Sequence, residues 1–219
     1  YVSYRILKDF RERFIQPFLH LEIDLHILVG NHDIYFRNTN DVNSLQELLG
    51  ANYKNIHIYP EAQEVDFGGF LMLMMPWINN SNYNHAMTHI KNTKAQVLFG
   101  HLDVAGFHMN KDMVSEGGLQ PKIFENLDVV ASGHFHTKSS IGNIHYLGTP
   151  YEITWSDYND QKGFHVFDTE TRELGLAGQV ETNRDPTVEE VIETVPCYER
   201  NTNLALTITS NHPSPATIY

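Results

Sequence analysis

The sequence predicts an α/β domain whose central sheet is buried on both faces. Short apolar runs recur along the chain, and most of them end at a glycine or a proline. Runs that are apolar throughout, without alternating polar residues, are typical of strands covered on both sides. Helical patterns lie between these runs, as in α/β proteins. The chain has 219 residues, of which 41% are hydrophobic, so one domain can bury a sizeable core.

The chain opens with a helical pattern. Apolar side chains recur at every fourth position, and Pro17 is expected to kink or end this helix. These apolar positions are Ile6, Phe10, Phe14 and Phe18. Strands are then expected at 23–29, 56–59 and 70–75, and helices at 44–49 and 83–91.

The following part of the chain is richer in strands. Strands are expected at 95–99 and 127–132, where Gly100 and Gly133 end the apolar runs, with a short helix at 121–125 between them. Further strands are expected at 144–147, 163–167 and 173–180. The pattern changes near residue 181. We therefore expect one domain at 1–181, and at 182–219 a peripheral C-terminal extension or the start of a truncated accessory region.

Charge and cysteine content exclude several classes of protein. The chain carries 27 acidic and 15 basic residues, a net charge of −12, which argues against a broad basic surface that binds nucleic acid by charge alone. Its single cysteine, Cys197, excludes an intrachain disulfide and a thiolate metal site. No apolar run is long enough to span a bilayer and no signal peptide is recognisable, so a cytoplasmic protein is expected.

Histidine is frequent, with 13 residues, and three strand ends carry it in the same local pattern. In each case an apolar run is followed by a glycine, and a histidine lies within the next two positions. The three segments are Gly30-Asn31-His32-Asp33, Gly100-His101 and Gly133-His134-Phe135-His136. Because ligands of α/β sheets bind beyond the carboxyl ends of the strands, these side chains are expected to meet in one crevice.

Each segment also has a simpler interpretation. Gly100 and His101 can form a turn with a hydrogen-bonded histidine, and the segment 30–33 can be a plain turn. In an extended segment, His134 and His136 would place both rings on one side. The three segments together favour a metal site. Imidazole nitrogens and an amide oxygen, without thiolates, suit manganese, iron or zinc better than magnesium or calcium.

In this order, the three segments resemble the third, fourth and fifth motifs of the calcineurin-like metallophosphoesterases. Over roughly residues 1–180 the chain also resembles the nuclease branch of that superfamily, which includes SbcD-type nucleases and the recombination endonuclease subunits of T-even phages. The segments that carry this second resemblance are 132–137, 146–150 and 163–171. The resemblance implies a metallophosphoesterase fold, a β-sandwich flanked by helices (αββα).

The resemblance further implies a site with two divalent metal ions, with manganese as the first choice and iron or zinc as alternatives. One ion would be bound by Asn31, His101 and His134 together with a bridging aspartate. The other ion would be bound by His136, the same aspartate and an Asp-x-His pair.

By the same resemblance, His32 and Asp33 would be the catalytic residues. His32 would lie beside the scissile phosphate and would protonate the leaving oxygen or stabilise the charge that develops on the phosphoryl group. Asp33 would orient His32 or its loop. A metal-held hydroxide would attack phosphorus in line.

The chain departs from the family at its start. The family's Asp-x-His and Gly-Asp-x-x-Asp motifs would precede the first helix, and the sequence contains no Gly-Asp dipeptide. Asp24-Leu25-His26 spells Asp-x-His, but it lies inside an expected strand and is interpreted as accidental. We therefore expect an N-terminally truncated domain without its first strand or strands. Two dications ~4 Å apart repel by about 17 kcal/mol at an effective dielectric constant of ~20, so without the bridging carboxylate one ion at most, and weak or no activity, are expected.

The function implied by the resemblance is that of a metal-dependent DNA exonuclease or endonuclease subunit in recombination and double-strand-break repair, in a bacterial or phage-infected cell. Its partners would be DNA, an SMC-like ATPase subunit (SbcC or a phage counterpart) and a second copy in a homodimer. One alternative is a metallophosphatase or cyclic-nucleotide phosphodiesterase with the same metal site. Another is a non-catalytic module that docks the ATPase.

Two further features are interpreted as structural. Trp77 follows Pro76 at a strand end and is expected to be a packing anchor, although an aromatic side chain at that place could stack on a base. Asp157 and Asp160 are expected in a solvated loop.

Overall fold

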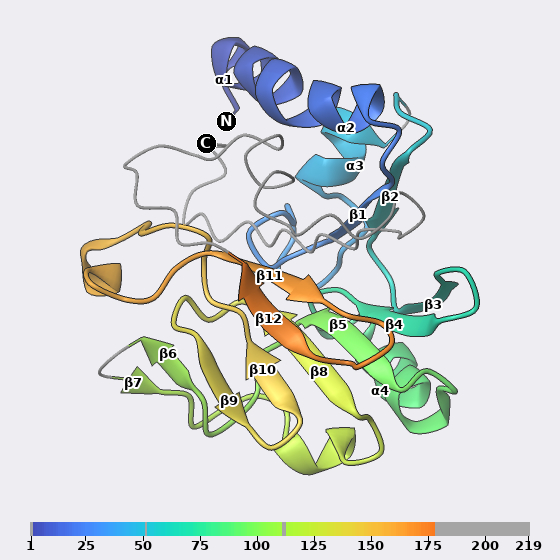
Figure 1. Cartoon of the computed structure of the whole chain (residues 1–219), viewed down its shortest axis with the longest axis vertical. Helices are drawn as coiled ribbons and strands as arrows, with labels where there is room; N and C mark the ends of the chain where they lie inside the picture. Colours follow the sequence, from blue (N-terminus) through green and yellow to red (C-terminus); the bar gives the residue numbers. More distant parts are fainter. Residues whose placement is uncertain (1, 51, 111–112, 178–219) are drawn as a thin grey trace.

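The computed structural model describes residues 2–50, 52–110 and 113–177. Its largest element is a six-stranded mixed sheet, to which helices and smaller sheets are added (Figure 1). The strand order is β3 (Gln63–Asp66), β4 (Leu71–Met75), β5 (Val97–His101), β8 (Val129–Gly133), β10 (Ile144–Tyr146) and β9 (Ser139–Ile141). Strands β4, β5, β8 and β10 are parallel, and the edge strands β3 and β9 are antiparallel to their neighbours. The predicted α/β class is confirmed.

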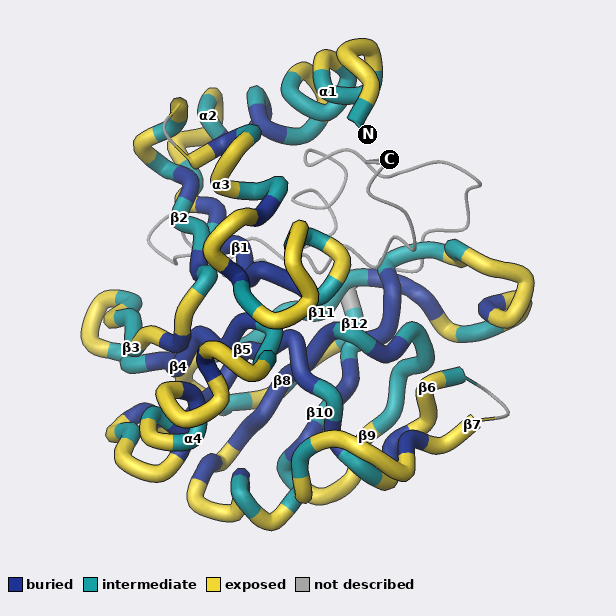
Figure 2. Tube along the Cα trace, turned by 180° about the vertical axis from the view of Figure 1, so that it is seen from behind, coloured by how far each residue is buried: buried dark blue, intermediate teal, exposed yellow. Residues whose placement is uncertain are grey.

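The central sheet is buried on both faces, as predicted. Strand β4 illustrates this, because Leu73 and Met75 belong to one apolar cluster, whereas Met72 and Met74 belong to another. Successive side chains of a strand point to opposite faces, so the two clusters lie on the two sides of the sheet. The inner strands are accordingly buried along most of their length (Figure 2).

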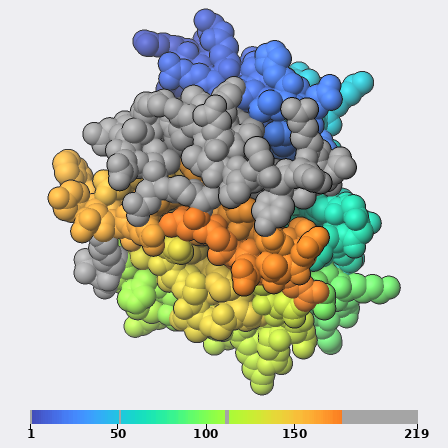
Figure 3. All heavy atoms as spheres, viewed as in Figure 1, coloured from blue at the N-terminus to red at the C-terminus, as the bar shows by residue number. Residues whose placement is uncertain are grey.

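Different elements cover the two faces. Helix α4 (Tyr83–Asn92) and the 3-10 helix η2 (Pro121–Phe124) pack on the first face. The antiparallel pair β11 (Phe164–Phe167) and β12 (Leu174–Ala177) packs on the second face. In Figure 3 this pair, in orange, lies on the surface in front of the sheet. The result is a layer of helices, the sheet, and a layer of strands.

The N-terminal helix is longer and less regular than expected. It consists of α1 (Tyr4–Phe10), a π-helical turn (Arg11–Ile15) and α2 (Gln16–His20). Of the two expected effects of Pro17, ending the helix is wrong, because the chain stays helical to His20. Pro17 lies in the first turn of α2 directly after the π-helical turn, where the absent N–H of proline is accommodated.

A second core joins these helices to a separate two-stranded parallel sheet. The sheet consists of β1 (Leu25–Leu28) and β2 (Ile56–Tyr59). Between them lies α3 (Ser44–Leu49), which begins at Asn43, whose side-chain oxygen accepts a hydrogen bond from the backbone N–H of Gln46 at 2.9 Å. The buried side chains of this core are Ile15, Phe18, Leu25, Ile27, Leu49 and Ile56. The predicted helix at 44–49 and both strands are confirmed.

The end of β1 is tied to the end of β4. The backbone N–H of Trp77, just after β4, donates to the carbonyl oxygen of Val29 at 2.8 Å. The side-chain amides of Asn40 and Asn82 donate to the carbonyl oxygen of Trp77 at 2.9 and 3.0 Å. Asn40 and Asn82 are both buried, so these bonds are shielded from water. They fix the loop after β1 beside the carboxyl edge of the central sheet.

The sequence analysis missed the edge strands β3 and β9 and a small hairpin of β6 (His108–Asn110) and β7 (Met113–Val114). These segments are mostly exposed or half-buried, so they lack the apolar runs that reveal inner strands. The predicted strand at 173–180 corresponds to β12, while the extension at 182–219 lies outside the described residues. The domain division therefore stays a prediction. Within the described part of the chain, no helix is long and apolar enough to cross a membrane.

Candidate functional site

The three glycine-histidine segments meet at the carboxyl edge of the central sheet. Strands β5 and β8 pair in a register that places His101 opposite Gly133. The hydrogen bond between Trp77 and Val29 brings the loop after β1 to the same edge. The predicted convergence of the three segments is therefore found in the structure.

Asn31 and His101 form the closest contact of the site. The side-chain oxygen of Asn31 lies 2.8 Å from Nε2 of His101, which is completely buried. Nδ1 of the same ring is also buried and has no hydrogen-bond partner among the described residues. Burial lowers the pKa of His101 well below its ordinary value, and the charges of His134 and His32 lower it further. The ring is therefore neutral at pH 7, which is the form of imidazole that binds metal ions.

Gly30 permits this close approach. A Cβ atom at position 30 would lie 3.0 Å from Cε1 of His101 and 3.2 Å from a carboxylate oxygen of Asp33. That carboxylate accepts a hydrogen bond from the backbone N–H of Gly30 at 2.8 Å. Asp33 thus holds the loop that presents Asn31 and His32, which agrees with the orienting role expected for it.

His134 lies against His101 and Trp77, with ring centroids 5.2 and 5.0 Å apart. Its backbone has a φ of 90°, which is rare for a residue with a side chain. Strand β8 ends at Gly133, so the segment 134–136 turns instead of remaining extended. The expectation that alternation aligns the rings of His134 and His136 is therefore wrong.

Electrostatic effects connect the remaining histidines to this cluster. Burial lowers the pKa of His134 to about 4; the carboxylate of Asp103 opposes this shift, whereas charges on His32 and His136 add to it. His32 also lowers the pKa of His101. All the histidines predicted for the site therefore lie within electrostatic range of His134.

His136 belongs to a buried ionic cluster that the sequence analysis missed. Its Nδ1 lies 3.5 Å from the carboxylate of Asp157, which is only 1% exposed. The Lys162 ammonium donates to the carbonyl oxygen of His136 at 2.7 Å and pairs with Asp157 and Asp160 at 3.4 and 3.0 Å. The expected solvated loop is therefore wrong for Asp157. A sequence signal existed, because Thr154 and Asp157 have capping-box spacing and form that motif.

Asp24 and His26 make their contacts elsewhere. Nδ1 of His26 lies 2.6 Å from the hydroxyl of Tyr59, and the carboxylate of Asp24 lies 3.2 Å from Nε2 of His57. All of these residues belong to β1, β2 or the residue before β1. These contacts agree with the interpretation of the Asp-x-His string as accidental.

The donor atoms fit part of a metal site. Asn31, His101 and His134 provide an amide oxygen and neutral imidazoles, with a buried ring nitrogen of His101 that has no hydrogen bond among the described residues. Across the part of the chain that the structure describes, no group of three or more His, Cys, Asp or Glu side chains is arranged to hold a metal ion. The set therefore lacks the carboxylate that would complete it.

No protein-family model matches the chain. Over 163 residues it is 40% identical to "Exonuclease subunit 1" of Enterobacteria phage T4, which is 74% of this chain and 48% of that protein. Over 95 residues it is 34% identical to the SbcD component of the nuclease SbcCD of Staphylococcus epidermidis, which is 39% of this chain and 25% of that protein. The matches thus span about half and a quarter of these two curated relatives. The resemblance to the SbcD-type nuclease branch is confirmed by these matches, and the chain is a homologue of both nuclease subunits.

Proposed function

We propose that this chain belongs to a metal-dependent phosphodiesterase that hydrolyses DNA, as a nuclease subunit in recombination and double-strand-break processing. The observation that carries the proposal is the convergence of Asn31, His101 and His134 at one edge of the sheet. The names of the two relatives, an exonuclease subunit and a nuclease subunit, support it. The αββα metallophosphoesterase fold is part of the proposal, supported by a sheet that has helices on one face and strands on the other.

Four side chains are proposed as metal ligands. Asn31, His101 and His134 would bind one divalent cation through an amide oxygen and imidazole nitrogens, with Mn²⁺ as the first choice. His136 would bind a second ion in the two-metal arrangement, and Asp157 would orient its ring as carboxylates commonly do for metal-bound histidines. When bound, the cation supplies Lewis-acid activation of the phosphoryl group.

His32 and Asp33 are proposed as the catalytic pair. His32 follows the ligand Asn31 directly, and its effect on the pKa of both His101 and His134 supports a position beside the metal-bound phosphate. It would donate a proton to the leaving oxygen. Asp33 would keep His32 in place through its hydrogen bond to the N–H of Gly30.

A net charge of −12 is compatible with a DNA substrate under this proposal. A cation bound at the strand ends would attract phosphate locally, so the chain needs no broad basic surface. An SMC-like ATPase subunit and a second copy of this chain are the proposed partners, and both could supply a wider DNA-binding surface. The cytoplasm of a bacterial or phage-infected cell is the proposed location.

Metal binding tests the site directly. Titration of the 219-residue chain with Mn²⁺, followed by the electron paramagnetic resonance signal of the free ion, should show at most one tightly bound ion. His101→Ala should weaken Mn²⁺ binding by more than about tenfold, because outer-shell changes alone cost that much at metal sites. Asn84→Ala, at an exposed position of α4, is the control and should leave binding unchanged. Equal Mn²⁺ affinity in the unmodified chain and His101→Ala would overturn the site.

Hydrolysis assays test the substrate class. Labelled single-stranded and double-stranded DNA, p-nitrophenyl phosphate and bis-p-nitrophenyl phosphate are compared with Mn²⁺ and with a chelator. We expect slow, Mn²⁺-dependent cleavage that favours DNA over the monoester, reduced about 100-fold in His32→Ala. Faster hydrolysis of the monoester would favour a metallophosphatase instead. Stimulation of an SMC-like ATPase that survives His32→Ala, without any hydrolysis, would favour a docking module.

A further inference from the structure

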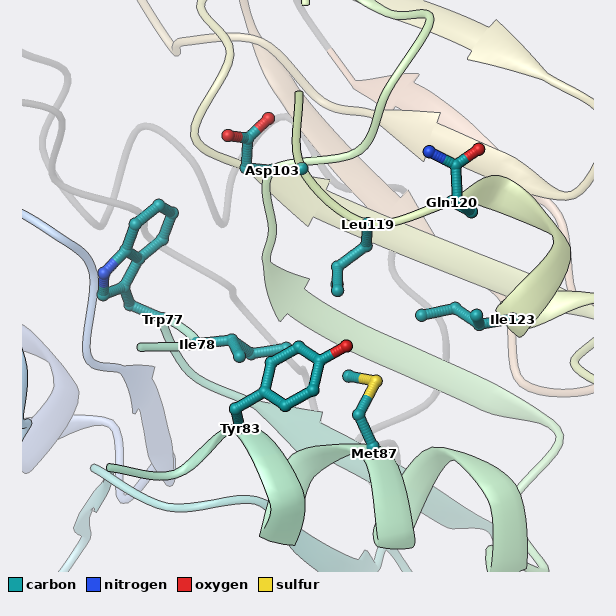
Figure 4. A pocket seen from close by; sticks show the side chains of 9 residues that line it. Trp77, Ile78, Tyr83, Met87, Asp103, Leu119, Gln120 and Ile123 are labelled. Atoms are coloured by element: carbon teal, nitrogen blue, oxygen red, sulfur yellow. The ribbon is translucent and has the colours of Figure 1, made fainter. Parts of the chain in front are cut away.

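A pocket of about 440 Å³ lies between α4, the loop after β5 and η2 (Figure 4). Its volume falls within the range of small-molecule sites in proteins. Four of its lining side chains are aliphatic or thioether groups: Ile78, Met87, Leu119 and Ile123. None of the roles proposed above uses this pocket.

Trp77 forms a wall that the pocket shares with the histidine cluster. Its indole lines the pocket, and its ring centroid lies 5.0 Å from that of His134 and 6.1 Å from that of His101. Asp103 also lines the pocket, and its carboxylate raises the pKa of His134. A group inside the pocket would therefore lie next to whatever the histidine cluster binds.

The walls of the pocket are fixed by backbone contacts. The side-chain amide of Asn82 donates to the carbonyl oxygen of Trp77 at 3.0 Å. On the opposite side, the N–H of Leu119 donates to the carbonyl oxygen of Asp103 at 2.8 Å. Gly118 has a φ of +79°, and a Cβ atom there would lie 2.4 Å from that carbonyl oxygen. The pocket is thus preformed, which lowers the entropic cost of binding.

The lining combines apolar surfaces with a few polar groups. Figure 4 shows Tyr83, Met87, Leu119 and Ile123 directed toward the same space, with Asp103 at its edge. The ring of Tyr83 is 48% exposed, so a ligand can reach it from solvent. Among the residues that the structure describes, no Lys, Arg or His lines the pocket, and Asp103 is its one charged residue. The pocket therefore suits an uncharged, flat group with polar edges and disfavours a phosphate.

We propose that this pocket binds a nucleobase of the nucleotide whose phosphate lies at the histidine cluster, an inference that rests on the proposed nuclease function. The base would stack on Tyr83 or Trp77, since aromatic side chains bind unstacked bases of any sequence in this way. The carboxylate of Asp103, held by the hydroxyl of Ser115 at 3.0 Å, would accept a hydrogen bond from an exocyclic amino group. Adenine, cytosine and guanine carry such a group and thymine does not, so thymine is disfavoured.

The fluorescence of Trp77 reports directly on the pocket. The chain has 2 tryptophans, and Trp155 is 94% exposed, so Trp155→Phe leaves Trp77 as the one fluorescent indole without disturbing the core. This variant is titrated, in Mn²⁺, with a short single-stranded phosphorothioate oligonucleotide and with an abasic oligonucleotide of equal length. Overall DNA binding is measured in parallel by the anisotropy of a labelled oligonucleotide. We expect the oligonucleotide with bases to quench Trp77 and the abasic one to leave it unchanged.

Two matched variants identify the stacking ring. Tyr83→Ala should weaken the base-dependent binding by about 5- to 150-fold, while affinity for the abasic oligonucleotide stays the same. Tyr4→Ala is the control, because Tyr4 is also the first residue of a helix and is 92% exposed. It should match the unmodified chain. Asp103→Asn should reduce the preference for cytosine over thymine.

The outcomes separate the pocket from the nuclease proposal. DNA binding without quenching of Trp77, or with equal affinity for the abasic oligonucleotide, would overturn the pocket and leave the nuclease proposal intact. Base-dependent quenching without DNA hydrolysis in Mn²⁺ would support the pocket and count against the nuclease. Equal effects of Tyr83→Ala and Tyr4→Ala would overturn the assignment of the base to this pocket.

Discussion

The side-chain oxygen of Asn31 lies 2.8 Å from Nε2 of the completely buried His101 and joins the loop after β1 to the end of β5. Asn31→Ala would leave this ring nitrogen buried without its partner. The free energy of unfolding should fall by about 1–3 kcal/mol, the cost of an unsatisfied buried polar group. Urea denaturation measures the change, with the exposed Asn84→Ala as the control, expected within about 0.5 kcal/mol of the unmodified chain. Equal stability of both variants would contradict the structure at this contact.

Gly30 should tolerate no side chain. In Gly30→Ala, the new Cβ would lie 3.0 Å from Cε1 of His101 and 3.2 Å from Asp33, so one of these groups must move. Overpacking of this kind costs about 1–3 kcal/mol, and the displaced imidazole should also weaken Mn²⁺ binding. At Gly117, where a Cβ meets nothing within 4 Å, the same substitution is the control for both measurements. Unchanged Mn²⁺ affinity in Gly30→Ala would separate His101 from the metal.

Asp157 should matter more for stability than its neighbour Asp160. It accepts hydrogen bonds from the N–H groups of Ile153 and Thr154 at 3.1 and 2.7 Å, besides its contacts with His136 and Lys162. Asp157→Ala should lower the free energy of unfolding by about 3 kcal/mol or more, because the buried ammonium of Lys162 loses a partner.

Asp160→Ala is the matched comparison in the same denaturation experiment. It removes one ion pair of Lys162 but keeps the hydrogen bonds of Asp157, so the loss should be smaller. The reverse order of the two variants would show that the cluster is organised around Asp160.

Local patterns were sufficient to predict the convergence at the sheet edge. An apolar run followed by Gly100-His101 or Gly133-His134 marks the end of a buried strand, and parallel strands end on one edge. The same reasoning failed for the direction of the rings, because the φ of 90° at His134 depends on its contacts with Trp77 and His101. Neither contact partner is near His134 in the sequence.

The ionic cluster around Asp157 shows a second limit of the sequence pattern. Lys162 reaches the carbonyl oxygen of His136 across two loops, and neither loop has the apolar periodicity that marks a helix or a strand. Acidic residues near turn-forming residues usually lie in water, so a solvated loop was the reasonable expectation. The capping-box spacing of Thr154 and Asp157 indicates a local helix start, but it does not indicate burial.

Stability should fall as the pH is lowered from about 6.5 to about 4. Burial, followed by the charge of His57, lowers the pKa of His26 from 6.5 to about 4, and burial does the same for His165. In this range the unfolded chain binds protons that the folded chain does not, so acid favours unfolding. The stabilisation is complete above pH 6.5 and is lost as the pH approaches 4, by at most ~1.4 kcal/mol per pH unit for each histidine.

Replacing His26 should remove part of this dependence. His26→Phe keeps a ring stacked on His57, whose centroid lies 4.6 Å away, but it cannot bind a proton. Urea midpoints measured between pH 7.5 and pH 4.5 should therefore change less in His26→Phe than in the unmodified chain. The exposed His20→Phe is the control and should keep the original pH profile. If His26→Phe also kept that profile, protonation of His26 would not be what destabilises the chain in acid, and the hydrogen bond between its Nδ1 and the hydroxyl of Tyr59 would have to persist at low pH.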